Sequence, residues 1–242
     1  MVFSFTFFIY NGQRLYRIKQ KTIHQKNHNE RIKWVVHHKK TLTVLSLLFA
    51  LIGLLCTLFI NPYCFFILIP MGALSVFYVV PILKTNLSLR TIPYLKVFVI
   101  GITWSATIVL LPMVDSEAIF KTSFGVVLLS FSQVFLFVIA ITLPFDVRDF
   151  KWDERNHLKT IPHLIGIKKT IICAKIILVA SILLTCFLPI GIYTAWLILG
   201  QVITLLIITF THEKRTELFY AGLIEGTVLI LYGACLFRFY FF

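Results

Sequence analysis

Three aspartates follow an apolar run long enough to cross a bilayer, and their types and spacing suit metal chemistry. Asp146, Asp149 and Asp153 are spaced i, i+3 and i+7. If the segment is helical, this spacing places all three carboxylates on one face. Clustered carboxylates at a membrane surface repel one another, so they need a cation, which is either a set of basic side chains or a divalent metal. Mg²⁺, which prefers oxygen ligands and often bridges to phosphate oxygens, is one such metal.

The composition indicates that these aspartates belong to a membrane protein. Hydrophobic residues make up 59% of the 242 residues and charged residues only 14%, whereas a soluble domain is about half apolar and about a quarter charged. Seven apolar stretches are each close to the roughly 20 residues that cross the hydrocarbon layer. They are 41–60, 63–82, 97–114, 122–144, 170–188, 190–211 and 218–237. With a partial span at 1–10, they predict an all-α, polytopic transmembrane helix bundle.

The distribution of basic residues predicts the orientation and argues against a nucleic-acid partner. The net charge is +13, but 20 of the 23 Lys and Arg residues lie in loops of one parity. Such a bias places those loops in the cytoplasm and accounts for the basic character without nucleic acid. We therefore expect an integral multi-pass protein of the bacterial cytoplasmic membrane, with the aspartates on the cytoplasmic side. The five cysteines form no C-x-x-C pair, so a zinc or redox site is not expected.

The sequence around the aspartates resembles one family of membrane enzymes. The chain reads DVRDFKWD from Asp146 to Asp153, followed by T-I-P from Thr160 and by Gly166. This is similar to the second aspartate motif of the UbiA family of intramembrane prenyltransferases, roughly D-x-x-D-x-x-x-D, a short spacer, T-[LI]-P and a Gly. The resemblance implies nine helices around a central cavity, with this motif after the sixth helix on the cytoplasmic side.

The resemblance implies transfer of an isoprenoid chain. In the family, two aspartate motifs hold Mg²⁺ that bridges to the diphosphate of a polyprenyl donor, and a membrane-soluble acceptor captures the carbocation. Catalysis and metal binding then fall to Asp146, Asp149 and Asp153. Arg155 and Lys159 become candidate partners of the diphosphate.

The family's first motif is altered in this chain. Placing Asn11 on the pattern N-D-x-x-D-x-x-x-D puts three residues that are not acidic at its acidic positions. They are Gly12, Leu15 and Lys19. Either the second motif holds one Mg²⁺ while Arg14, Arg17 or Lys19 pairs directly with phosphate oxygens, or the chain binds lipid without catalysis. Asn11 and Arg14 are therefore candidate substrate-binding residues.

Glu225 is the remaining candidate, and it belongs to the predicted last span. An ionisable group at that depth is costly and usually faces the bundle interior, so Glu225 is expected to line a cavity and bind substrate. If 1–10 is the end of the family's second helix, the spans match helices two to nine. We then expect a single domain over 1–242 and a natural protein that begins upstream of Met1.

Three functions remain open at this point. The leading one is a prenyltransferase that takes an isoprenoid chain from a polyprenyl diphosphate. The second is a non-catalytic lipid-binding or assembly protein on the same scaffold. A transporter is third, because the chain shows no obvious inverted repeat or paired broken helices.

Overall fold

The computed structural model describes residues 1–19, 30–80, 88–155, 158–191, 193–213, 215–229 and 231. Within these residues the regular structure is helical and includes no strand. The predicted all-α helix bundle is therefore confirmed. The chain divides into two compact units, Met1–Leu89 and Arg90–Phe242.

All seven predicted spans coincide with apolar helices. Four of these helices are long and apolar enough to cross a membrane, and they cover Lys39–Phe59, Leu95–Asp115, Phe124–Arg155 and Ile167–Cys186. The other three are shorter in the described part of the chain, and they cover Pro62–Phe77, Tyr193–Thr209 and Phe219–Leu229. The chain is thus an integral membrane protein.

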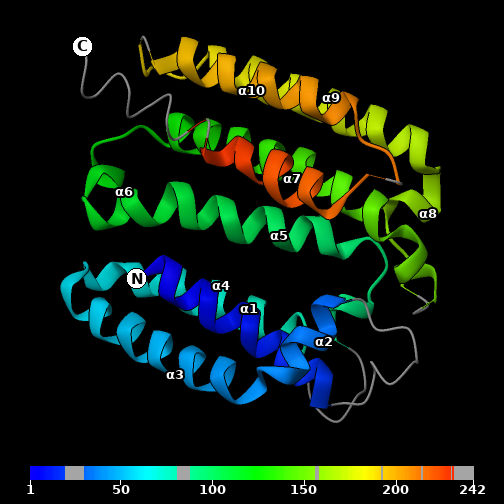
Figure 1. The fold of residues 1–242 in the computed structure, drawn as a ribbon. Coiled ribbons are helices and arrows are strands. Elements are labelled where there is room, and N and C mark those ends of the chain that lie inside the picture. The colour runs from blue at the N-terminus through cyan, green and yellow to red at the C-terminus, as the bar shows by residue number, and fades with distance from the viewer. Residues whose placement is uncertain are drawn as a thin grey trace. The chain divides into compact units, whose positions relative to one another are not determined.

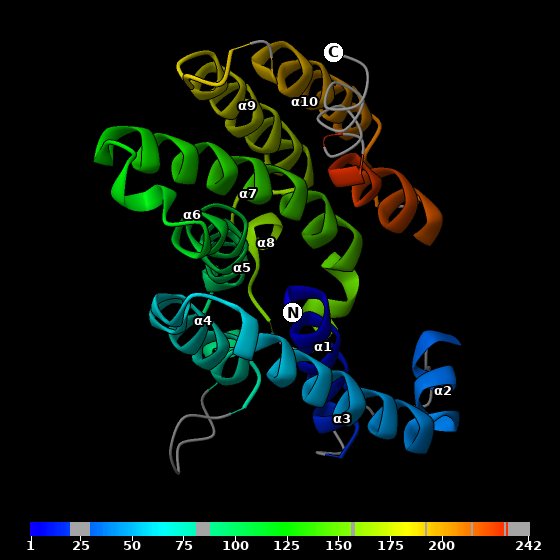
Figure 2. The same ribbon diagram turned by 90° about the vertical axis from the view of Figure 1, so that its left-hand side faces the viewer.

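The first unit contains four helices. They are α1 (Val2–Lys19), α2 (Glu30–His37), α3 (Lys39–Cys56) and α4 (Phe65–Phe77). Helix α1 packs along α3 (Figures 1 and 2). A Cβ atom on Gly53 of α3 would lie 3.0 Å from the Phe5 ring of α1, so this glycine permits the close approach that helices in lipid require. The Gln13 amide donates to the Ser75 carbonyl at 2.8 Å and joins α1 to α4.

Two features of this unit differ from the sequence interpretation. The partial span predicted at 1–10 continues to Lys19 as an 18-residue helix, which includes both Asn11 and Arg14. Each bonds one turn back: Asn11 Nδ2 donates to the Phe7 carbonyl and Arg14 to the Tyr10 hydroxyl. These i, i+4 contacts satisfy the polar groups without ending the helix. Helix α2 lies between the predicted spans 1–10 and 41–60, where the sequence interpretation placed no helix.

The second unit places one long helix between its neighbours. Its helices are α5 (Leu95–Ser105), α6 (Leu111–Asp115), α7 (Phe124–Arg155), α8 (Ile161–Ile165), α9 (Ile167–Cys186) and α10 (Tyr193–Thr209). A π-helical turn, η6 (Phe219–Ile224), follows. Helix α7 packs against α5 on one side and α9 on the other, and α10 packs on α9 (Figure 1).

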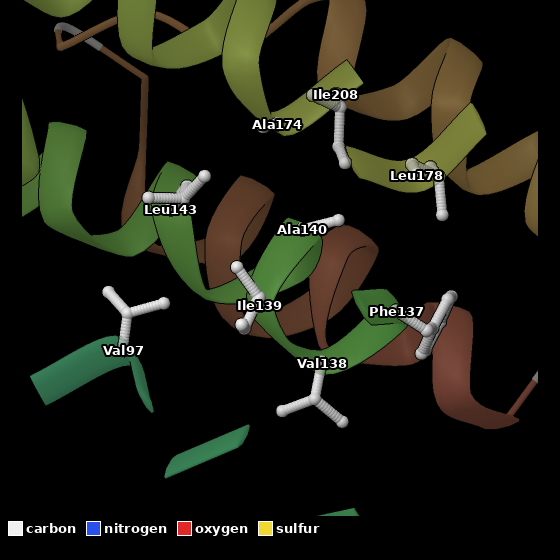
Figure 3. Close-up of a cluster of buried hydrophobic side chains, with 9 residues drawn as sticks. All are labelled: Val97, Phe137, Val138, Ile139, Ala140, Leu143, Ala174, Leu178 and Ile208. Carbon is white, nitrogen blue, oxygen red and sulfur yellow. The ribbon is translucent and has the colours of Figure 1, made fainter. Parts of the chain in front are cut away.

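Apolar side chains of α5, α7, α9 and α10 form the core of this unit (Figure 3). They are Val97, Phe137, Val138, Ile139, Ala140, Leu143, Ala174, Leu178 and Ile208. Buried polar pairs cross the same interfaces, since Gln133 bonds with Ser181 and Gln201 donates to Thr185 at 2.9 Å. With 32 residues, α7 is about 48 Å long. It exceeds the roughly 30 Å of hydrocarbon, so its carboxyl end projects toward the membrane surface.

Candidate active site

The carboxyl end of α7 carries all three aspartates of the motif on continuous helix, beyond the predicted end of this span at residue 144. Asp146 is fully buried and Asp153 is 3% exposed, whereas a third of the Asp149 side chain is exposed. Helical geometry accounts for this difference: a residue at i+7 returns to within about 20° of residue i, whereas i+3 lies about 60° away. Asp146 and Asp153 therefore share the buried face, and Asp149 lies at its edge.

Lys96, in the first turn of α5, neutralises the deepest carboxylate. Its Nζ lies 2.5 Å from Asp146 Oδ1. Lys96 also acts electrostatically on Asp153, as does Arg90 just before α5. The start of α5 thus brings a cation to both buried carboxylates at the end of α7.

Sequence reasoning treated Lys96 only as a determinant of topology. One signal was available, because the topology puts the start of the 97–114 span and the end of the 122–144 span on the same membrane side. A lysine at the first end and aspartates at the second are then candidates for pairing.

Arg148 neutralises the third carboxylate. Its Nε and Nη2 donate to the two oxygens of Asp149 at 2.8 and 3.1 Å. Its Nη1 lies 3.5 Å from a Glu217 oxygen. The guanidinium carbon is 5.0 Å from the centre of the Phe145 ring and 5.6 Å from that of Tyr220, so cation–π attraction also holds this group.

A second ion pair joins the segment before η6 to α7. Lys151 Nζ lies 3.5 Å from Glu213 Oε2. The Tyr220 hydroxyl donates to the His212 carbonyl at 2.9 Å, so the same tyrosine that contacts Arg148 also fixes the start of this segment. Residues 212–213 and 215–217 therefore lie along the last turns of α7.

The T-I-P…G part of the motif shapes the backbone. Thr160 is the N-cap of α8, with its hydroxyl 2.9 Å from His163 Nδ1 and Pro162 in the first turn. Gly166 then adopts φ +83° and ψ 156° and starts α9, a conformation that is essentially restricted to glycine. These residues turn the chain from α7 into α9. The turn also meets α5, because Tyr94 N–H donates to the Lys159 carbonyl at 3.1 Å.

The other residues predicted for the site lie in different surroundings. Arg155 and Lys159 are exposed close to the aspartates in sequence, and Glu225 is exposed beyond η6. Asn11 is buried in α1 of the first unit, and Arg14 is partly buried there. The side chains of Arg17 and Lys19 are outside the described residues.

The carboxylates suit a cation that also uses ligands from outside the protein. Asp146 Oδ2 and Asp153 Oδ2 are buried, and no hydrogen-bond donor among the described residues reaches them. Among the described residues, no three His, Cys, Asp or Glu side chains converge on one metal position. Mg²⁺ in particular is usually bound by one or two carboxylates, substrate phosphates and water rather than by an all-protein cage. The two open oxygens are consistent with that mode of binding.

Fold and site together define a membrane-embedded helix bundle with an acidic site at the end of its longest helix. The family model described as "UbiA prenyltransferase family" matches residues 35–218, which is 184 of the 242 residues. The chain therefore belongs to the UbiA prenyltransferase family. The matched region includes the three aspartates and Lys96, whereas Asn11 and Arg14 precede it and Glu225 follows it. No curated protein and no solved structure matched the chain.

Proposed function

We propose that this chain transfers an isoprenoid group from a polyprenyl diphosphate to a membrane-soluble acceptor, at the cluster formed by Lys96, Asp146, Asp149 and Asp153. The observation that carries the proposal is a pair of buried oxygens, Asp146 Oδ2 and Asp153 Oδ2, for which the described part of the chain supplies no hydrogen-bond donor. A buried acceptor without a donor is costly. A divalent cation on these oxygens removes that cost.

Each residue of the cluster has a distinct role in this proposal. Asp146 and Asp153 hold Mg²⁺, which when bound neutralises the donor's diphosphate as a leaving group. Lys96 pairs with Asp146 and offers further N–H donors toward phosphate oxygens. Arg155 and Lys159 are exposed cations that meet the diphosphate from the membrane surface. By the positive-inside bias, this surface is cytoplasmic.

The residues of the first unit and the last helix complete the proposal. Asn11 and Arg14 bind substrate in this proposal, with Arg14 pairing directly with phosphate oxygens. Glu225 contacts the acceptor or the donor chain.

A non-catalytic lipid-binding protein is the second candidate, and one observation favours it. Lys96 and Arg148 already neutralise Asp146 and Asp149, and the family's first acidic set is absent from the sequence. A chain that retains the fold and its lipid-facing surface can bind an isoprenoid lipid without reacting with it.

Binding of a non-hydrolysable geranylgeranyl diphosphate analogue to the purified protein in detergent, with and without Mg²⁺, separates these candidates. Asp146→Asn/Asp153→Asn should lose the Mg²⁺-dependent part of the affinity. Glu154→Gln is the matched control, because Glu154 is an exposed carboxylate beside Asp153 on the same helix. Mg²⁺-dependent binding that this control keeps and the double variant loses supports the prenyltransferase. Metal-independent binding, equal in all variants, favours the lipid-binding protein.

A further inference from the structure

Arg148 has two carboxylates within reach. It donates two hydrogen bonds to Asp149, at 2.8 and 3.1 Å. A Glu217 oxygen lies 3.5 Å from its remaining terminal nitrogen. Neighbouring residues on a helix do not face each other, so helix geometry does not impose the pairing of Arg148 with Asp149.

The guanidinium of Arg148 is held more firmly by its surroundings than the carboxylate of Asp149 or of Glu217 is. It lies against the Phe145 and Tyr220 rings, and only 19% of the side chain is exposed. By contrast, a third of Asp149 and half of Glu217 are exposed. The two carboxylates can therefore rotate toward or away from a stationary cation.

Asp149 is also close to the other two aspartates of α7. Its charge acts on both Asp146 and Asp153. Arg148 donates a hydrogen bond to each carboxylate oxygen of Asp149. While these bonds are in place, Asp149 is poorly available as a ligand for a metal cation.

We propose that Arg148 is a positioning residue that exchanges between Asp149 and Glu217, and that this exchange decides whether Asp149 is available to the divalent cation. When Arg148 pairs with Asp149, the cation site has two carboxylates. When Glu217 takes over Arg148, Asp149 turns toward the site as a third. The inference rests on the proposed function, because it concerns the same cation.

Removing Glu217 tests the exchange. Glu217→Gln removes the carboxylate that receives Arg148 when Asp149 turns toward the cation, so recruiting Asp149 becomes less favourable. We expect the affinity for Mn²⁺, measured by electron paramagnetic resonance with the diphosphate analogue present, to fall about threefold to fivefold, the effect of one partly exposed ion pair. Arg148→Gln frees Asp149 and should raise the affinity about threefold, and Arg148→Lys, which cannot bond in a bidentate manner, should fall between Arg148→Gln and the wild type.

Two controls separate the exchange from a simple loss of negative charge. Glu213→Gln removes the same charge from the same segment, but Glu213 pairs with Lys151, so Mn²⁺ affinity should stay at the wild-type value. In the Arg148→Gln background, Glu217→Gln should have no further effect. Thermal unfolding in detergent shows which variants remain folded.

Each result has one meaning. Equal Mn²⁺ affinity in the wild type and Glu217→Gln overturns the exchange and leaves the proposed function standing. The exchange is also overturned if Glu217→Gln weakens Mn²⁺ binding equally with and without Arg148. The effect would then come from the loss of a negative charge and not from Arg148. Absence of Mn²⁺ binding in folded wild-type protein overturns the proposed metal site itself, and the exchange with it.

Discussion

Lys96 Nζ lies 2.5 Å from Asp146 Oδ1, although the two residues are 50 positions apart in the chain. This contact joins the first turn of α5 to the part of α7 that leaves the core. It satisfies one oxygen of a fully buried carboxylate and leaves the other open. One ion pair thus both holds two helices together and sets the charge of the candidate site.

Replacing Lys96 should destabilise the protein. Lys96→Met leaves Asp146 buried without its counter-charge, which we expect to cost about 2–4 kcal/mol, because breaking a buried ion pair by removing one partner is strongly destabilising. Thermal unfolding in detergent measures the effect. Lys168→Met is the control, since Lys168 is exposed at the start of α9. Adding Asp146→Asn should restore part of the loss; a double variant no more stable than Lys96→Met would show that the pair is unimportant.

Two contributions to the affinity for the diphosphate analogue, one from divalent cations and one from basic side chains, should be separable by removing the cations. In EDTA we expect the affinity to fall about tenfold, or about 1.4 kcal/mol. The remainder comes from basic side chains, so Arg155→Gln/Lys159→Gln should lower it a further threefold or more. Lys168→Gln/Lys169→Gln removes equal charge from exposed positions nearby and should have little effect. Equal losses in both double variants would indicate general attraction rather than contact with the diphosphate.

Local sequence patterns predicted most of the fold. Apolar stretches of about 20 residues determine spans, because a bilayer leaves few alternatives to helices. The apolar stretch at 122–144 ended too early, because α7 continues through the aspartates to Arg155; the i, i+3, i+7 spacing indicated only that they share a face if they are helical. The charged stretch after 1–10 was misleading, because its polar side chains bond one turn back within α1 and do not end the helix.

The contacts that define the site depend on tertiary packing and were not predicted. Nothing near Lys96 in the sequence indicates Asp146, since their pairing follows from how α5 packs on α7. The pairing of Arg148 with its neighbour Asp149 is also contrary to the usual i, i+4 rule. It forms where η6 supplies Tyr220 to position the guanidinium.

Gly166 should tolerate no side chain, although it has open space around it. A Cβ there meets nothing within 4 Å, but φ is +83°. Gly166→Ala should therefore destabilise the protein by about 1–3 kcal/mol through backbone strain alone, and it should weaken binding of the analogue by shifting α8. Gly125 also has nothing within 4 Å of a Cβ atom, but its φ is not positive. Gly125→Ala is therefore the control and should be neutral or slightly stabilising. Equal unfolding temperatures for the two variants would contradict this assignment.

Gly101 is limited by space rather than by backbone conformation. A Cβ on this residue of α5 would lie 2.8 Å from the Phe135 ring of α7. Gly101→Val should thus separate the two helices that carry Lys96 and Asp146, with a loss of about 1–3 kcal/mol from overpacking. Phe135→Leu in the same chain should recover much of the stability and of the analogue binding, because it removes the ring that the new side chain meets. Gly72→Val, where a Cβ meets nothing within 4 Å, controls for the valine itself. If Phe135→Leu does not improve Gly101→Val, close packing at this point does not hold α5 against α7.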